Sequence, residues 1–432
     1  MAKAVLTRRD AAATRPRRAV ELARPLPWRS LTRDALGMWP VSRVAYALFT
    51  WLAVVLTTAG SARAGSDTLA RRVFTFPQLV DAWNQWDAAI FYLPIATHGY
   101  TTPTSASFFP LYPMLVSVVA RVIGAPNVVV AGLVISNLAA LAACVALALL
   151  AARDGALAGR PQAAVRALLV SPFAFFLAAP YNTALLLALV LWCWLWARRG
   201  QWYFAAGAAF LAALTHVTGV ALILPLIYEY GAQRDWWHAR RWLERDVRPA
   251  LAWLRATVRF AVVALAAPAG LALYSFACWL RFGDALQWLH AQQRDFNHAS
   301  LPPWQALGDI WGALDAAPNG TYLQLRQLID VVPLLLVLAL LVVGIAQRAW
   351  PASYAIFVAA LLYLCIASPV VGTYFPDLVP GSGRYLLAAF PIYLLLGRWM
   401  ARSHQAELAI VLLGALTQAA LLAAYLNGVW IV

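Results

Sequence analysis

Charged side chains are scarce in this chain of 432 residues, because Asp, Glu, Lys and Arg together make up 12% of it. Only 18 residues are acidic, and all but one of the 33 basic residues are arginines. The net charge of +15 does not indicate nucleic-acid binding, because the arginines gather beside long apolar runs. So few acids also leave a short list of residues able to act as a catalytic base.

Cysteine ligand patterns and nucleotide-binding motifs are lacking as well. The four cysteines all lie in apolar runs, and the chain has no CxxC motif or Cys/His ligand spacing. This pattern argues against a disulfide framework and against a zinc site. No P-loop, Rossmann fingerprint or Gly-x-Ser-x-Gly elbow is present, so a nucleotide-sugar donor is disfavoured.

Long apolar runs dominate the sequence, in which 63% of the residues are hydrophobic. A run of about 20 apolar residues is long enough to cross a membrane as a helix. We therefore predict an all-α polytopic membrane protein with ten or eleven transmembrane helices in one membrane domain, residues 44–430. A short helix is expected at 108–124, and the run 166–197 is divided in two by Pro180-Tyr181-Asn182. The remaining predicted spans are 44–62, 127–151, 203–228, 259–280, 329–347, 351–371, 384–400 and 407–427.

The arginine clusters predict the orientation in the membrane. Basic residues concentrate in the N-terminal tail, residues 1–43, and in an amphipathic segment, residues 229–259. Cytoplasmic segments carry this excess, so both are predicted to be cytoplasmic, with 229–259 lying on the inner leaflet. Residues 63–107 and 282–328 are then outer loops. The composition is typical of a bacterial inner-membrane protein whose outer loops face the periplasm.

The crossing direction of the middle helices has two solutions. If 108–124 crosses the membrane, the basic stretch after residue 151 lies outside, against the charge bias. If 108–124 only dips into the membrane, Tyr181-Asn182 lies outside and Arg198-Arg199 inside. The second solution needs a break in the run 203–228, for which Thr215-His216-Val217-Thr218-Gly219 is the candidate.

One carboxylate stands out because tryptophans surround it. Asp87 lies in "WNQWDAAIFYL", where apolar residues over 78–93 recur at three- and four-residue steps. That spacing predicts a helix lying at the membrane interface, the depth that Trp and Tyr prefer. Partial desolvation there would raise the basicity of Asp87. Asp87 is either a catalytic base or the polar face of an interfacial helix.

Several motifs in order resemble the PIG-V-type mannosyltransferases and their bacterial relatives. The resemblance covers roughly residues 44–400, and its order and spacing are specific. The matching stretches are "WDAAIFYLPIATHGY" (86–100), "FFPLYP" (108–113), "VISNLAALAACVALALL" (134–150), "LLVSPFAFFLAAPYNTALLLAL" (168–189), "AGAAFLAALTHVTGVALILP" (206–225), "RFGDALQWLHAQQRDF" (281–296) and "GSGRYLLAAFPIYLLLG" (381–397).

The resemblance implies a membrane glycosyltransferase of the GT-C architecture. Such enzymes transfer a sugar, here mannose, from a polyprenyl or dolichyl phosphate to an acceptor on the non-cytoplasmic side, with inversion. The Trp-Asp motif falls on Trp86 and Asp87, which assigns Asp87 as the base. The family's Tyr-Thr/Ser-Glu motif corresponds to Tyr181-Asn182-Thr183-Ala184, in which Ala184 stands where the family has glutamate. The family's Leu-Thr-Arg motif corresponds to a stretch in which His216 stands where the family has arginine. These two departures leave open a polar network rebuilt around Asn182 and His216, a different acceptor, or a loss of activity.

The donor phosphate needs a cation, and Arg384-Tyr385 matches the family's Arg-Tyr motif. Arg384 follows Gly381-Ser382-Gly383 and is expected to open a continuous helix, "RYLLAAFPIYLLLG". The helix N-terminus would add backbone N–H donors for a phosphate. The alternative is an arginine that only anchors the helix end.

Other polar residues and other functions remain open. His98 follows Asp87 by eleven residues, beyond Pro94, and is either a substrate-binding residue or a surface histidine. The expected partners are membrane lipids, a lipid-linked sugar donor and an unidentified glycan or lipid acceptor, with no cofactor. A divalent metal is a minor alternative, suggested by histidines and aspartates in 282–328 without ligand spacing. A transporter or flippase of lipid-linked glycans, and an inactive scaffold, are the competing functions.

Overall fold

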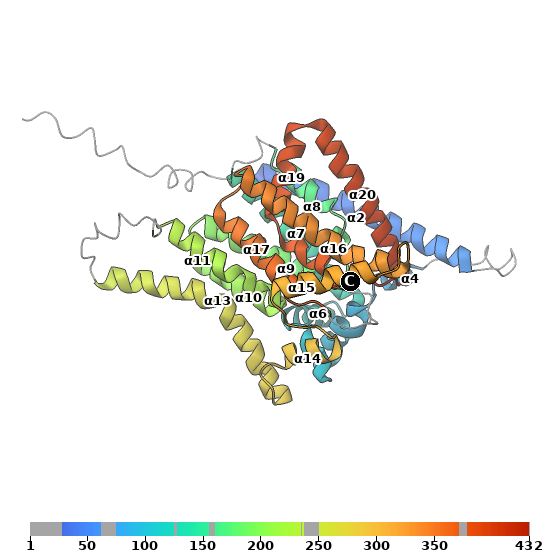
Figure 1. Cartoon of the computed structure of the whole chain (residues 1–432), viewed down its shortest axis with the longest axis horizontal. Coiled ribbons are helices and arrows are strands. Elements are labelled where there is room, and N and C mark those ends of the chain that lie inside the picture. Colours follow the sequence, from blue (N-terminus) through green and yellow to red (C-terminus); the bar gives the residue numbers. More distant parts are fainter. Residues whose placement is uncertain are drawn as a thin grey trace, which may run out of the picture.

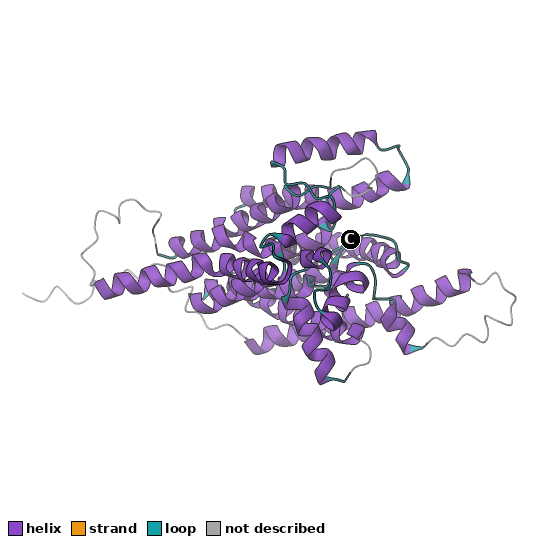
Figure 2. Cartoon of the chain, turned by 90° about the horizontal axis from the view of Figure 1, so that it is seen from below, coloured by secondary structure: helices purple, strands orange, loops and turns teal. Residues whose placement is uncertain are grey.

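The computed structural model describes residues 28–61, 75–124, 128–154, 160–234, 236, 250–370 and 378–431. These residues form helices joined by loops, and no strand occurs among them (Figure 2). Five helices are long and apolar enough to cross a membrane. The described part of the chain is therefore all-α and contains candidate membrane spans. These helices are α2 (Trp28–Ser61), α7 (Val128–Arg153), α13 (Ala250–Phe282), α16 (Tyr322–Ala346) and α20 (His404–Leu426).

Shorter helices pack against the long ones (Figure 1). The predicted division of the run 166–197 is confirmed, because a 3₁₀ turn at Ala174–Leu177 and a bend at Pro180-Tyr181 separate two helices. The predicted break in 203–228 is confirmed at His216, whose backbone is extended between two helices. The shorter helices are α6 (Leu111–Val122), α8 (Gln162–Leu169), α9 (Thr183–Arg198), α10 (Trp202–Thr215), α11 (Ile223–Ala232), α17 (Ala352–Ile366) and α19 (Pro391–Arg402).

Small residues let the central helices approach closely. Helix α10 carries six buried alanines, and Gly270 of α13 packs against it. A Cβ at Gly270 would lie 2.5 Å from the Phe210 carbonyl oxygen, so only glycine fits there. Without a strong hydrophobic drive between helices in lipid, such close backbone contact is what holds spans together.

Arg198 joins the C-terminal ends of three helices. Its guanidinium lies 3.1 Å from the Asp154 carboxylate, just beyond α7, and 2.9 Å from the Glu229 carboxylate of α11. Ser353 and Tyr354, at the start of α17, donate hydrogen bonds to Glu229 and Asp154 respectively. Helices α7, α9 and α11 therefore end together, and α17 begins at the same end of the bundle.

Helix α6 does not reach that end. The Tyr112 hydroxyl donates to the Gly132 carbonyl oxygen at 3.1 Å, near the start of α7. Since α7 continues to Arg153, and a helix rises 1.5 Å per residue, the 12-residue α6 stays beside the first turns of α7. Tyr181 lies beside Ser136, toward the start of α7 and away from the Arg198 end, which is the arrangement that the second solution needs.

Several predicted boundaries are wrong or lie outside the described residues. The continuous helix over 78–93 is wrong: α4 (Phe76–Asp81) ends, a turn follows, and a π-helical turn η1 (Ala88–Tyr92) leads into α5 (Leu93–His98). The region 282–328 is helical, with α14 (Gln287–Asp295), α15 (Pro303–Ala316) and the first turns of α16. Residues 1–27, 62–74 and most of 233–249 are not described, so the predicted basic tail and inner segment fall largely outside the structure.

Candidate active site

Asp87 and Arg384 form a buried ion pair. The Arg384 Nη2 atom lies 3.2 Å from the Asp87 Oδ2 atom. Asp87 is 7% exposed and Arg384 is 3% exposed. The sequence predicts separate roles for the two residues, a base and a phosphate ligand, and the structure brings them into direct contact.

A strained backbone positions Asp87. The preceding residue, Trp86, has a φ of 51°, in the left-handed region that tryptophan rarely adopts. Its indole N–H donates to the Val429 carbonyl oxygen at 3.2 Å, and its ring meets the Trp430 ring edge-on at 4.8 Å. Contacts near the C-terminus therefore hold the turn that ends the expected interfacial helix. Strain of this kind persists only where surrounding contacts enforce it, and it concentrates at functional sites.

Aromatic rings surround the Arg384 guanidinium. Its Cζ atom lies 4.9 Å from the centre of the Tyr181 ring and 4.7 Å from the centre of the Tyr385 ring. Nη2 also donates to the Tyr385 hydroxyl at 2.8 Å. Tyr181 is itself fixed, because its hydroxyl donates to the Gln85 carbonyl oxygen at 2.9 Å. Two residues of the predicted site, Tyr181 and Tyr385, are thus direct neighbours of Arg384.

Two of the three guanidinium nitrogens have no acceptor. Nε and Nη1 of Arg384 are buried and make no hydrogen bond within the described residues. Leaving a buried charged donor unpaired is costly, so such groups normally find a partner. The site as it stands can satisfy this demand by taking an anionic oxygen.

Asp330 holds the segment that carries Arg384. Its Oδ2 atom accepts hydrogen bonds from the backbone N–H groups of Leu378 and Val379, at 3.1 and 3.3 Å. Its carbonyl oxygen accepts a 2.6 Å hydrogen bond from the Ser382 hydroxyl. Arg326, one helical turn earlier in α16, lies 2.9 Å from Asp330 Oδ1. Asp330 therefore fixes the backbone on the N-terminal side of Arg384.

Sequence analysis missed Asp330, which lies inside a predicted span. The available signal was an acid four residues after an arginine at the edge of an apolar run, because charges inside a membrane segment are rare and paired. The expected continuous helix from Arg384 is also wrong. Helix α18 (Ser382–Tyr385) is a single turn, followed by a 3₁₀ turn at Leu386–Ala388 before α19 begins at Pro391. The Asp330 contacts, rather than a helix N-terminus, position Arg384.

His216 and Asn182 occupy the helix breaks beside this site. The His216 ring stacks on the Tyr385 ring with centroids 4.4 Å apart. Its Nδ1 atom accepts a 3.2 Å hydrogen bond from the Thr218 N–H. The Asn182 amide donates to the Thr215 carbonyl oxygen at 3.0 Å, so it satisfies an acceptor left free where α10 ends. His216, which stands at the arginine of the resembled motif, and Asn182 thus serve one structural junction.

His98 lies apart from these residues. It is exposed, and its Nδ1 atom is 2.8 Å from the Thr97 hydroxyl. The histidines and aspartates of 282–328 are also spread out: His290 pairs with Asp284, whereas Asp295 pairs with Arg294. No group of three His, Cys, Asp or Glu residues that could hold a metal ion occurs among the described residues.

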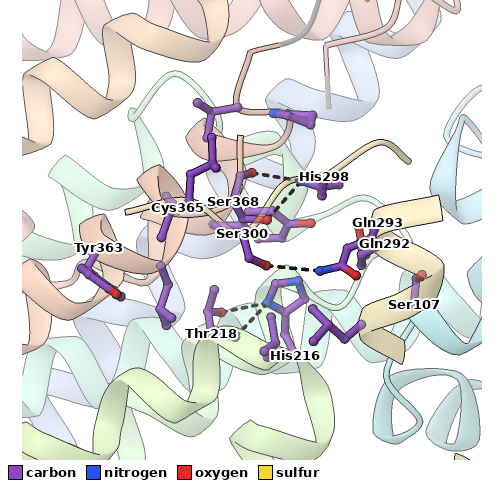
Figure 3. Close-up of a pocket in the computed structure, with 18 of the residues that line it drawn as sticks. Ser107, His216, Thr218, Gln292, Gln293, His298, Ser300, Tyr363, Cys365 and Ser368 are labelled. Carbon is purple, nitrogen blue, oxygen red and sulfur yellow. Dashed lines mark hydrogen bonds between the residues drawn. The ribbon is translucent and has the colours of Figure 1, made fainter. Parts of the chain in front are cut away.

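A cavity of about 870 Å³ adjoins the ion pair. Tyr385 and His216 form part of its wall, and Asp87 and Arg384 lie outside its lining. In Figure 3, His216 and Thr218 lie on one side of the cavity, while His298 and Ser368 lie on the other. A volume of this size is typical of small-molecule sites. Nothing in the sequence indicated it, because its walls come from five separate parts of the chain.

Burial shapes the protonation of Asp87. Removal from water disfavours the charged carboxylate and raises the pKa of Asp87, while the Arg384 guanidinium opposes this shift. A carboxyl group with a raised pKa is a stronger base than an exposed aspartate once it is ionised. Burial, a charge partner and an adjacent cavity are the combination that marks a candidate active site.

The fold and site define a helical protein with candidate membrane spans and a buried Asp–Arg pair beside a cavity. In comparisons with known proteins, no family model, no curated protein and no solved structure matches the chain.

Proposed function

We propose that the chain is a membrane glycosyltransferase of the GT-C architecture, which transfers a sugar from a polyprenyl phosphate donor to an acceptor hydroxyl. The observation that carries this proposal is the buried Asp87–Arg384 pair, in which Nε and Nη1 of Arg384 have no hydrogen-bond partner among the described residues. The motif resemblance to PIG-V-type mannosyltransferases supports mannose as the sugar.

The donor phosphate binds at Arg384. Nε and Nη1 donate to its oxygens in a site from which the aromatic rings exclude water, where charge-assisted hydrogen bonds are strong. The phosphate then shares with Asp87 the positive charge of Arg384. With its partner engaged elsewhere, Asp87 becomes more basic, because the opposing effect of Arg384 on its pKa weakens.

Transfer follows as a single displacement. Asp87 accepts the proton of the acceptor hydroxyl, whose oxygen forms a bond to the anomeric carbon of the donor sugar. The bond from that carbon to the phosphate oxygen breaks, and its electron pair leaves with the polyprenyl phosphate. Arg384 stabilises the charge that develops on the leaving phosphate. The anomeric configuration inverts, because attack and departure occur on opposite faces.

Membrane placement follows from the same proposal. The Asp87 end of the bundle faces the non-cytoplasmic side, where lipid-linked donors are consumed, and the Arg198 end faces the cytoplasm. Arginines at the ends of α7 and α9 agree with this orientation, since cytoplasmic segments are enriched in basic residues. The host membrane is assigned as a bacterial inner membrane, with the site open to the periplasm.

Donor consumption tests the proposal directly. Purified protein in lipid nanodiscs is incubated with polyprenyl phosphates that carry mannose, glucose or galactose, together with a membrane lipid extract as acceptor. Mass spectrometry then follows the release of polyprenyl phosphate. We expect consumption of one donor, and a loss of about 10²–10⁴-fold for Asp87→Asn, the range for removal of a general base.

A matched control separates chemistry from a general effect of removing an acid. Asp309 is exposed on α15, so Asp309→Asn should leave the rate unchanged. Near-normal turnover of Asp87→Asn would exclude its role as the base. Absence of consumption with every donor and lipid extract, in protein that unfolds cooperatively, would refute the transferase proposal.

A further inference from the structure

The cavity beside Tyr385 differs chemically from the ion pair behind it. Among the described residues that line it, none is an aspartate, glutamate, lysine or arginine, although the cavity has a volume of about 870 Å³. Burying an unpaired charge in such a wall is expensive, so the cavity disfavours a phosphate or a carboxylate. Any ligand suited to it is uncharged.

The two histidines of the lining offer complementary hydrogen-bonding atoms. His216 Nδ1 accepts from the Thr218 N–H, so in the neutral ring Nε2 carries the proton and is a donor. His298 Nδ1 lies 2.9 Å from the Ser368 carbonyl oxygen, which can only accept, so its Nε2 is an acceptor. Burial also lowers the pKa of His298, which keeps its ring neutral at pH 7. A ligand with several hydroxyl groups, each of which both donates and accepts, can use both atoms.

Amide and aromatic groups complete the lining. The Gln292 side chain is half-buried and makes no hydrogen bond to the described protein, while Gln293 donates to Ser300 at 3.4 Å. Trp304 and Tyr363 border the cavity and are 75% and 56% exposed. Exposed aromatic faces suit the apolar face of a sugar ring, and amides suit its hydroxyl groups.

We infer that this cavity binds the sugar-bearing end of the acceptor, a neutral glycan or glycolipid headgroup rich in hydroxyls. The inference rests on the proposed function and adds the chemical class of the acceptor. Tyr385 separates the two ligands: its ring lines the neutral cavity, while its hydroxyl contacts Arg384, the site of the anionic phosphate. Donor and acceptor are thereby distinguished by charge on opposite sides of one residue.

A pair of aryl glycosides that differ in one charge tests the inference. Binding of p-nitrophenyl β-glucoside and p-nitrophenyl β-glucuronide to the full chain in nanodiscs is measured by calorimetry, with the neutral galactoside and mannoside alongside. At least one neutral glycoside should bind, and the glucuronide should bind at least tenfold more weakly than the glucoside. Equal binding of the charged and neutral pair, or no binding of any neutral glycoside, would overturn the inference.

Variants assign the binding to this cavity. Gln292→Ala should weaken the bound glycoside about threefold to tenfold, the value of one hydrogen bond, whereas Gln305→Ala, an exposed glutamine on α15 outside the lining, should not. Unchanged binding in Gln292→Ala would place the glycoside elsewhere. Polyprenyl phosphate without a sugar is then added as a competitor. If it displaces the glycoside, and Gln292→Ala weakens the binding of this lipid too, the cavity is a groove for the lipid chain of the donor.

The same measurements separate the inference from the proposed function. Glycoside binding is repeated in Asp87→Asn, which removes the proposed base and leaves the cavity lining intact. Donor consumption without glycoside binding refutes the cavity assignment alone. Glycoside binding that depends on Gln292, in a chain that consumes no donor, refutes the transferase proposal and leaves a neutral-sugar site.

Discussion

Replacing Arg384 with lysine tests the phosphate site without emptying it of charge. A lysine ammonium can take the place of Nη2 beside Asp87, so the buried carboxylate keeps a partner. It supplies no counterpart for Nε and Nη1, the two nitrogens that have no acceptor among the described residues. The variant therefore removes the proposed phosphate donors and preserves the ion pair.

The magnitude follows from the number of hydrogen bonds lost. A hydrogen bond to a charged group contributes about 1.5–3 kcal/mol. Because the ammonium still attracts the phosphate, we expect the loss of about one such bond, which is about 10- to 100-fold in donor affinity. Arg384→Ala also leaves Asp87 unpaired, and breaking a buried pair costs about 3–5 kcal/mol. That variant should bind donor more weakly than the lysine variant by a further 1–2 kcal/mol or so, and it should unfold at a lower temperature.

Donor affinity is measured by competition between polyprenyl phosphate and a fluorescent lipid phosphate in nanodiscs. Thermal unfolding of each variant confirms folding, and Arg281→Lys, an exposed arginine that donates to the Tyr100 carbonyl oxygen, is the matched control. A lysine variant with wild-type affinity and wild-type unfolding temperature would refute phosphate binding at Arg384. The residue would then only neutralise Asp87.

Three further predictions follow from the same contacts. Asp330→Asn should lower the free energy of unfolding by about 3 kcal/mol, because Arg326 loses its carboxylate partner, and should weaken donor binding, because the carboxylate no longer holds the backbone before Arg384. Adding Arg326→Gln should recover part of the stability but not the donor affinity. Recovery of both would show that Asp330 acts only through its ion pair. The pKa of Asp87 is raised, so the transfer rate should increase with pH above about pH 4, the ordinary pKa of aspartate, as the carboxyl group ionises. The contribution of Asp87 to folding stability should decrease with pH over the same range, because the folded state binds this proton more tightly than the unfolded state does. A pH-independent rate across pH 4–7 would contradict the role of base. In intact cells, a cysteine at exposed Thr102 should react with a membrane-impermeant maleimide, and a cysteine at exposed Gln201 should not, because the two positions lie at opposite ends of the bundle. The native cysteines are buried and should not react. The reverse labelling would invert the proposed orientation.

Local patterns in the sequence were sufficient for the helices and their breaks. Five of the predicted spans became long helices, since a backbone that is buried or faces lipid must satisfy its own hydrogen bonds. The predicted spans 203–228 and 384–400 are broken, and 351–371 holds a shorter helix, α17. The division at Pro180-Tyr181-Asn182 and the break at His216 were visible because proline and clustered polar residues interrupt the apolar pattern. Where long-range contacts overrode the local pattern, prediction failed: Trp86 is held in a left-handed conformation by residues near the C-terminus, which ends the expected interfacial helix.

Part of the candidate site was also predictable from the sequence, and part was not. Asp87 and Arg384 were found as residue types in unusual surroundings, and the structure places both in one buried pair. The pairing of Asp330 with Arg326 could be expected from their spacing, but its hydrogen bonds to the backbone of Leu378 and Val379 could not, because backbone groups do not depend on residue type. The cavity could not be predicted either, because its lining comes from separate parts of the chain.

Sequence alone determined the helical membrane class and the short list of acids from which Asp87 emerged, because both depend on composition and on periodicity over fewer than about 20 residues. Tertiary structure alone decided that Asp87 faces Arg384, that two of the Arg384 guanidinium nitrogens have no partner among the described residues, and that a cavity whose described lining carries no Asp, Glu, Lys or Arg lies beside Tyr385. These features are set by how helices from distant parts of the chain pack, and packing depends on the shapes of all the buried side chains together.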